Sequence, residues 1–343
     1  MKLGVFLLAG QFPGLTEGEA LAGAVDTACT AEQAGLDSVW IAEHHFITYG
    51  VCPSAVAFAA NVLGRTSRIT IGTAVCMLSN RHPVALAEET ALLDHLSGGR
   101  FALGVGRGGP WVDLEVFGTG LARFEDGFEE SLDLLLAALE QGRVAADDER
   151  SRFFRFRPVP VVPRPATEPR PPVVVAATSF PTVERAAVRG LPLLLGVHAT
   201  DEDKRDLLTH YARVAAEHGH DPDAAEHIGT AICHIAGSRA DAQAELRAAM
   251  PEWIRSGVGG YVPLSPGPGP VRDPGAYVEH LLAIHPVGTP EECVAQLRAS
   301  ARSTGINTVL LMVEGTGNPG RTRETVLRLG TEVAPMLKIT AVR

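Results

Sequence analysis

One segment of this chain reads RITIGTAV at residues 68–75, PVALAEETALLDHL at 83–96 and FALGVG at 101–106. The outer two pieces are short and β-rich, whereas the middle piece begins with proline, which is favoured at the first position of a helix. Gly98 and Gly99 follow it, where glycine commonly ends a helix. A strand, a helix and a strand in this order predict a parallel βα unit.

The same alternation continues in both directions along the chain. Two of the helices begin with Thr-x-x-Glu capping boxes, at Thr16 and Thr289. Eight βα repeats in 343 residues predict an α/β fold, a (β/α)₈ TIM barrel with insertions, forming a single domain over residues 1–343. A doubly wound sheet with a second domain is the structural alternative. The predicted strands are residues 3–9, 37–42, 68–75, 101–106, 172–177, 191–197, 228–236 and 308–313.

Two segments interrupt this pattern. Residues 142–172 are rich in charge, arginine and proline, which predicts an insertion on the surface. Residues 257–288 contain GVGG and SPGPGP, so we expect a long, mobile loop there with no regular element. Because the chemistry of such barrels lies on the loops after the strands, this loop could act as a lid.

Composition and charge limit the possible partners. The net charge is −10 and the pI is about 5.6, so nucleic acid or an anionic membrane would be repelled, and a small-molecule substrate fits better. Five cysteines without a C-x-x-C pair indicate a reducing, cytoplasmic compartment. The opening MKLGVFLLAG is too short for a signal peptide, and no run reaches the roughly 18 apolar residues of a membrane span.

Two imidazoles and a carboxylate follow the predicted strand 37–42, as Glu43-His44-His45. This is where a barrel places catalytic groups. Neighbouring side chains on an extended backbone point in opposite directions, so at most one of the histidines faces the centre of the mouth. The H-x-H spacing that would predict a metal site is absent. Histidines that are merely hydrogen-bonded at a strand end are the alternative.

Two further turns are suited to anions. Strand 101–106 runs into GVGRGG, in which glycines let the backbone approach a ligand and Arg107 supplies a cation. Pro110 follows instead of a helix, so this is no dinucleotide fingerprint, and a solvated arginine is the alternative. The segment TSFPT at 178–182 offers hydroxyls and amides at a helix start, where a phosphate or a simple helix cap would fit.

Six motifs follow one another along the chain: EHHF (43–46), IGTAV (71–75), NRHP (80–83), LLDHLSGGRFALGVGRG (92–108), VVVAATSFPT (173–182) and HPVGTPEEC (285–293). This ordered series resembles the bacterial luciferase-like flavin monooxygenase family almost from end to end. The resemblance implies a (β/α)₈ barrel that binds reduced FMN at the strand ends, a separate flavin reductase that supplies it, and dioxygen as co-substrate. The organic substrate would be an aldehyde, a ketone or an aromatic ring.

The resemblance also implies roles for single residues. His44 corresponds to the family's catalytic histidine, which we expect to manage one proton because an imidazole titrates near neutral pH. A non-proline cis peptide is expected between Ala74 and Val75, under the flavin ring. Gly106 stands where luciferase α has a cysteine, which predicts open space beside the ring. Further residues expected at the site are the phosphate contacts Arg107, Ser179 and Thr182, then Thr178, where luciferase α has a glutamate, and Glu43, His45 and Asp113 as substrate or supporting residues.

Three alternatives remain within and outside this family. EHHF follows the catalytic α subunit of luciferase, whereas HPVALAEE and AATS look more like the non-catalytic β subunit. One chain with both kinds of feature suggests a homodimer with a complete site in each protomer. A deazaflavin-dependent oxidoreductase and a non-catalytic flavin-binding subunit are the competing interpretations. A phosphosugar isomerase or aldolase barrel would need a strand-end lysine or paired carboxylates, which are not evident.

Overall fold

Eight parallel strands form a closed barrel in the computed structural model, which describes residues 1–147, 149, 151–264 and 273–338. The strands pair in the order β3-β2-β1-β13-β10-β9-β8-β5, and β3 also pairs with β5, which closes the sheet. The predicted (β/α)₈ barrel is therefore confirmed and the open doubly wound sheet is wrong. The barrel strands are β1 Lys2–Leu7, β2 Ser38–Ile41, β3 Thr70–Thr73, β5 Phe101–Gly106, β8 Val173–Ala177, β9 Leu193–Leu195, β10 Ile228–Ile232 and β13 Thr308–Met312.

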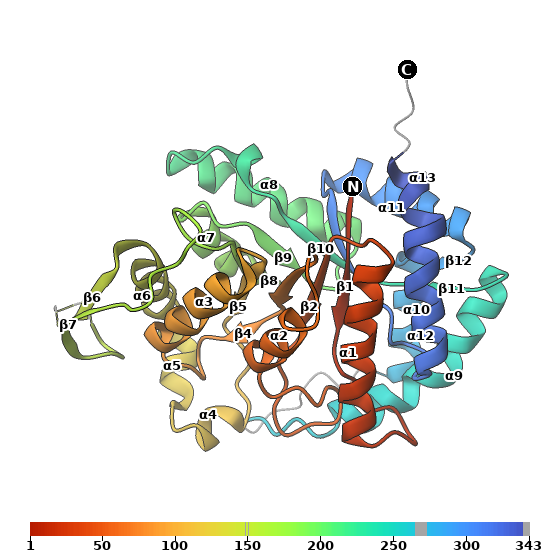
Figure 1. The fold of residues 1–343 in the computed structure, drawn as a ribbon, viewed down its shortest axis with the longest axis horizontal. Helices are drawn as coiled ribbons and strands as arrows, with labels where there is room; N and C mark the ends of the chain where they lie inside the picture. The colour runs from red at the N-terminus through yellow and green to blue at the C-terminus, as the bar shows by residue number, and fades with distance from the viewer. Residues whose placement is uncertain (148, 150, 265–272, 339–343) are drawn as a thin grey trace.

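Helices surround the barrel on its outside (Figure 1). Both predicted capping boxes are formed, at Thr16 before α1 and Thr289 before α11, and Gly98 ends α3 in the left-handed conformation. The larger helices are α1 Glu17–Gln33, α2 Ala55–Leu63, α3 Pro83–Ser97, α6 Phe128–Gln141, α7 Phe180–Ala187, α8 Asp201–Glu217, α9 Arg239–Val258, α10 Pro274–Ile284, α11 Pro290–Thr304 and α12 Pro319–Arg328; the short ones are α4 Asp113–Val116, α5 Gly120–Asp126 and α13 Ala334–Lys338.

The inside of the barrel is filled by side chains from six of the strands. Trp40 is the largest of them, and the absence of a side chain at Gly72 on the neighbouring strand leaves room for its indole ring. A packed interior of this kind leaves the two open ends of the barrel as places for a ligand. The buried residues of this interior cluster are Trp40, Ala102, Val174, Leu194, Ile228 and Leu310.

Two predicted strands are interrupted. The predicted strand 68–75 ends at Thr73, and β4 Cys76–Met77 follows after a cis peptide bond between Ala74 and Val75, as expected at that bond. The predicted strand 228–236 is divided into β10 and β11 His234–Ile235. The second piece leaves the barrel to pair with β12 Val287–Gly288, which the sequence pattern did not indicate.

The expectation of one long loop over residues 257–288 is wrong in its second half. Helix α10 begins there with Asp273 as its cap and Pro274 at its first position, and its buried face packs between α9 and the barrel. The helix was missed because its start signal directly follows the glycine- and proline-rich GVGG and PGPGP runs. The part of the proposed lid at residues 265–272 lies outside the described residues.

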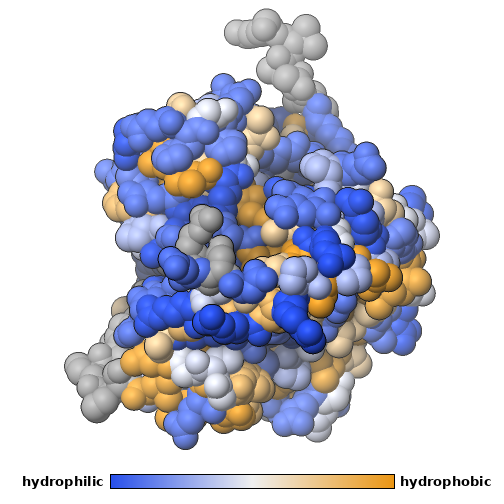
Figure 2. Space-filling view, turned by 90° about the vertical axis from the view of Figure 1, so that its left-hand side faces the viewer, coloured by the Kyte–Doolittle hydropathy of each residue, from blue (hydrophilic) through white to orange (hydrophobic). Residues whose placement is uncertain are grey.

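The insertion at 142–172 contains an antiparallel hairpin, β6 Arg143–Ala146 and β7 Phe156–Pro160, at the left of Figure 1. Phe154 and Val161 are buried and hold the segment on the barrel. Figure 2 shows this side of the molecule as a mixture of hydrophilic and apolar areas. Among the described residues, no helix combines the length and apolar character needed to cross a membrane.

Candidate active site

A cavity of about 500 Å³ lies at the carboxyl end of the barrel strands. Its wall comes from residues at or just after the ends of β1, β2, β3, β5, β8, β9 and β10. Its volume falls within the ~300–1,000 Å³ that is usual for small-molecule sites. Seven of the residues expected at the site line it: Glu43, His44, His45, Ala74, Val75, Asp113 and Thr178.

His44 projects into this cavity from the segment after β2. The ring of Tyr49 meets it edge-on, with 5.3 Å between the ring centroids. The Nδ1 atom has no solvent contact and no hydrogen-bond partner in the described part of the chain. Gly50 allows this close packing, because a Cβ atom there would lie 2.6 Å from Nδ1. The His44 ring thus lines the cavity while its Nδ1 atom is packed against Gly50, which leaves Nε2 as the ring nitrogen that a ligand could reach.

The environment of His44 changes its expected protonation. Burial, with a smaller contribution from the charge of His45, lowers the pKa of His44 to about 4 against the opposing effect of Glu43. The neutral imidazole is the dominant form at pH 7. The expectation that His44 titrates near neutral pH is therefore wrong, because the surrounding loops exclude the water that would stabilise the imidazolium.

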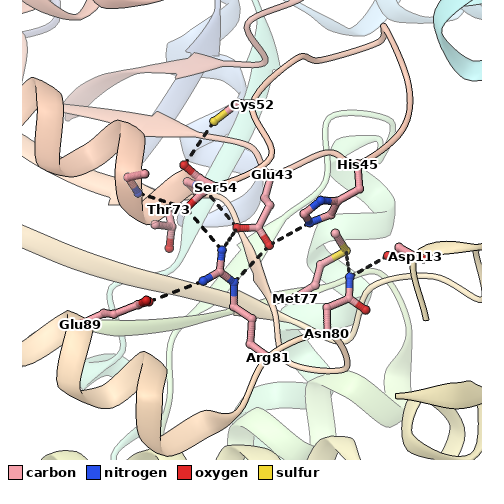
Figure 3. A network of polar contacts seen from close by, with 12 residues as sticks. Glu43, His45, Cys52, Ser54, Thr73, Met77, Asn80, Arg81, Glu89 and Asp113 are labelled. Carbon is pink, nitrogen blue, oxygen red and sulfur yellow. Dashed lines mark hydrogen bonds and ion pairs between the residues drawn. The ribbon is translucent and has the colours of Figure 1, made fainter. Parts of the chain in front are cut away.

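A buried ion pair fixes the segment that carries His44 (Figure 3). The Glu43 carboxylate, with its side chain fully out of solvent, lies 2.8 Å from Arg81 Nη2 and 3.5 Å from His45 Nε2, and it accepts a hydrogen bond from the Ala55 amide. Burial alone would raise the pKa of Glu43, but the His45 hydrogen bond and the Arg81 charge outweigh it and lower that pKa. Glu43 and Arg81 thus position the strand end rather than face the reacting atoms.

Arg81 was missing from the residues expected at the site, although the NRHP motif contains it. Its partner Glu43 is 38 residues earlier in the chain, so no local pattern joins them. Asn80 was also missing from the expected residues, and its partner is also distant in the chain: its Nδ2 atom donates to Asp113 Oδ2 at 2.7 Å (Figure 3). The Oδ1 atoms of Asn80 and Asp113 are buried and lack partners among the described residues.

The two turns suited to anions, one after β5 and one after β8, lie next to each other because β5 pairs with β8. Arg107 has no carboxylate partner in the part of the chain that the structure describes, and its guanidinium lies 4.3 Å from the centroid of the Phe124 ring. Burial lowers the pKa of Arg107, and the nearby charge of Arg185 adds to this. An unpaired arginine beside a second cation is a favourable place for a phosphate.

The start of α7 completes this turn. Ser179 is its N-cap residue but accepts no capping hydrogen bond; instead, its hydroxyl lies 3.3 Å from that of Thr182. The helix-cap alternative for Ser179 is thus not what the structure shows. Pro181 has no amide hydrogen and the Thr182 and Val183 amides donate to the Ser179 carbonyl, so the two hydroxyls are the main groups that this helix start offers to an anion. Arg107, Ser179 and Thr182 do not line the large cavity but flank it on the β5 and β8 side.

Gly106 does not leave the expected open space. A Cβ atom at this position would lie 2.8 Å from Val75 Cγ2 and 3.6 Å from Ala176 Cβ, so these side chains already fill the volume that a cysteine would take. Gly106 is absent from the cavity wall. The expectation was wrong because Val75, in the segment between β3 and β4, occupies the gap.

The rim of the cavity is closed by two segments that are far apart in the chain. Trp111 stacks on Tyr261 with 4.6 Å between ring centroids, and the Val112 amide donates to the Val262 carbonyl at 2.8 Å. The sequence did not indicate this contact. Within the described residues, no group of three or more His, Cys, Asp or Glu side chains could hold a metal ion.

The chain is similar to known proteins over almost its whole length. A family model described as luciferase-like monooxygenase matches residues 1–308. The alkanal monooxygenase alpha chain of the Kryptophanaron alfredi symbiont is 31% identical over 358 residues, which cover 98% of this chain and 99% of that relative.

Two solved structures show the same fold. Monooxygenase RslO1 from Streptomyces bottropensis gives a TM-score of 0.83 at 24% identity, covering 98% of this chain and 99% of its own. The oxygenating constituent of 3,6-diketocamphane monooxygenase from Pseudomonas putida, a type II Baeyer–Villiger monooxygenase in complex with FMN, gives 0.78 at 18% identity over 99% and 100%. The motifs, the barrel and these matches together place the chain in the luciferase-like monooxygenase family of flavin-dependent enzymes.

Proposed function

We propose that this chain is a monooxygenase that uses reduced FMN and dioxygen to oxidise a small organic substrate, such as an aldehyde, a ketone or an aromatic ring. The observation that carries the proposal is the cavity at the strand ends, with the His44 imidazole in its wall and the turns of Arg107 and Ser179 beside it. A bound reduced flavin would supply the electrons with which dioxygen is activated.

The residues present fit such a cofactor. Arg107, Ser179 and Thr182 would hold the phosphate, because together they offer a free guanidinium, two hydroxyls and the start of a helix. Ala74 and Val75 line the cavity and would lie against the flavin ring, with Thr178 at the end of β8. Solved structures of this fold include both an FMN complex, at 18% identity, and an F420 adduct, at 20%, so the choice of FMN rests on the alkanal monooxygenase alpha chain, which is 31% identical.

His44 would manage the proton of the reaction. Because burial lowers its pKa to about 4, the imidazole is neutral and can accept a proton from, or hydrogen-bond to, a group in the cavity. Asp113, which lines the cavity and is held by the hydrogen bond from Asn80, would help to position the ligand. The aromatic rim at Trp111 and Tyr261 would keep water away from the reacting atoms.

The remaining parts of the proposal concern partners and location. The chain would act in the cytoplasm, receive reduced FMN from a separate reductase, and form a homodimer with a complete site in each protomer. Support for the homodimer comes from exposed apolar side chains on neighbouring segments: Leu92 and Leu96 on α3, and Val162 in the insertion. The two segments are in contact, since His95 hydrogen-bonds to the Arg164 carbonyl.

Anaerobic titration tests the cofactor directly. Reduced FMN should bind to the purified protein and, after exposure to air, oxidise members of a panel of aldehydes, ketones and aromatic compounds, with light emission recorded in parallel. A reduced deazaflavin is titrated in the same way as the competing cofactor. Binding of the deazaflavin alone, or no product from any substrate despite tight FMN binding, would contradict the proposal.

A variant of His44 separates catalysis from flavin binding. His44→Ala should lower the rate of product formation by about 10²–10⁴-fold, which is the usual contribution of one acid–base group. The Kd for reduced FMN should change less than about threefold, because the phosphate contacts are untouched. His218→Ala, at the exposed end of α8 and outside the cavity wall, is the control. Equal rates for His44→Ala and the wild type would favour a non-catalytic flavin-binding subunit.

A further inference from the structure

A second, much smaller cavity lies behind the wall of the large one. Its volume is about 20 Å³, and it is enclosed between β1, β10 and β13 on one side and α9 and α10 on the other. Four residues line both cavities: Phe6, Leu8, Tyr49 and Val197. The small cavity is therefore an annex of the large one rather than a separate surface feature.

The annex is large enough for one small molecule but unsuited to water. About 10–15 Å³ is enough for one molecule of water size, and a stable buried water needs two to four polar partners. Three of the eleven lining residues have a polar side-chain atom, namely Tyr49, Trp253 and Tyr277. The Trp253 Nε1 atom has no hydrogen-bond partner among the described residues and lies toward Gly10, which does not line the annex, so only the two tyrosine hydroxyls could contact a water there. The rest of the wall is hydrocarbon and thioether.

One aromatic side chain separates the annex from His44. The Tyr49 ring stacks on Trp253 at 4.6 Å between centroids, with an interplanar angle of 13°. Its edge contact with His44 is on the side of the large cavity. A molecule in the annex would thus be held next to the histidine to which we assign the proton, without taking up space that the organic substrate needs.

We propose that the annex is a binding site for dioxygen. The inference rests on the proposed function, in which dioxygen is a co-substrate. Dioxygen is uncharged, about the size of water, and gains nothing from hydrogen bonds, so a dry apolar cavity next to the reaction site favours it over water. The terminal carbons of a long apolar substrate are the competing occupant, and the experiments below distinguish the two.

The chain provides its own reporters for this site. Met250 and Met312 line the annex and are almost fully buried, whereas Met336 is only half-buried and lies far along the chain in α13. Dioxygen is paramagnetic and speeds the relaxation of nearby nuclei. In flavin-free protein labelled with ¹³C-methyl methionine, oxygen pressure should raise the relaxation rates of Met250 and Met312 several-fold more than that of Met336, relative to equal nitrogen pressure. Equal or smaller effects at the two buried methyls would overturn the proposal.

Filling the annex tests whether the reaction uses it. Leu281→Phe on α10 places a larger side chain in the wall of the annex. It should remove the effect of oxygen pressure on the Met250 and Met312 methyl relaxation. It should also lower the second-order rate constant for the reaction of the reduced, FMN-loaded enzyme with dioxygen by about tenfold, while the Kd for FMN stays unchanged. Leu282→Phe, equally buried on the same helix but outside the annex, is the matched control and should leave both values unchanged. Ile254→Phe is the second filling variant if Leu281→Phe does not fold.

The outcomes separate the two hypotheses. A shift of Leu281→Phe toward shorter substrates, with the dioxygen rate unchanged, would overturn the proposal in favour of a pocket for the substrate chain. The wild-type enzyme could show the effect of oxygen pressure on the Met250 and Met312 methyls and yet fail to react with dioxygen when loaded with reduced FMN. That result would refute the proposed function but not the proposed dioxygen-binding site.

Discussion

Glu43 is a carboxylate held out of water by Arg81, and this pair positions the segment that carries His44. Arg81→Met should lower the free energy of unfolding by about 3–5 kcal/mol, because it leaves a buried charge without its main partner. Urea unfolding at pH 7 measures this loss. Arg213→Met, which removes an exposed i,i+4 pair with Glu217, should cost less than about 1 kcal/mol. Similar losses for the two variants would show that the buried pair has no special structural role.

The Val75 side chain fills the space beside Gly106, so a larger residue at position 106 would clash with it. Gly106→Ala should lower stability by about 1–3 kcal/mol, because the new methyl would lie 2.8 Å from Val75 Cγ2. The double variant with Val75→Ala should recover most of the loss, and thermal unfolding compares the three proteins. In α1, Gly23→Ala meets nothing within 4 Å and should cause no loss. Additive effects of the two substitutions would argue against the contact.

At the scale of elements, β9 is joined to the segment before β10 by a buried histidine. The Leu193 amide donates to His227 Nδ1 at 3.1 Å, and burial lowers the pKa of His227 from its ordinary 6.5 to about 4. The folded state thus disfavours protonation of His227. Its contribution to stability is complete above pH 6.5 and is lost as the pH falls toward 4.

His227→Asn isolates this effect, because the asparagine oxygen can replace Nδ1 as an acceptor but does not titrate. Between pH 7.5 and 4.5, the wild type should lose up to about 3 kcal/mol more unfolding free energy than the variant. Urea unfolding at both pH values measures the difference. Parallel losses in the two proteins would mean that His227 does not titrate with folding.

At the scale of the whole molecule, the proposed homodimer needs an interface. Leu96 and Val162 are 74% and 71% exposed on adjoining segments of the face that carries α3 and the insertion. Leu96→Lys should convert the dimer to a monomer, because a desolvated ammonium is costly in an apolar interface. Light scattering after gel filtration measures the mass. The control is Leu327→Lys on α12, also exposed, which should leave the mass unchanged. A wild-type monomer would rule out the dimer.

The motifs and the strand–helix alternation were sufficient to predict the family, the barrel and most of its elements. Helix ends can be predicted because a helix start or end depends on residues within one turn of each other. The capping boxes at Thr16 and Thr289 and the glycine that ends α3 are examples. Helix α10 is the exception, since its own start signal lies directly after a glycine- and proline-rich run.

The details of the site depend on contacts between distant parts of the chain. The Glu43–Arg81 pair, the Asn80–Asp113 hydrogen bond and the filling of the space at Gly106 by Val75 join residues that closure of the barrel brings together. The protonation of His44 follows from burial by several loops at once, which no local pattern encodes. Local hydrogen bonds and hydrophobic periodicity depend on residues that are close in the sequence. Desolvation and tertiary packing depend on residues that come together only when the barrel has closed.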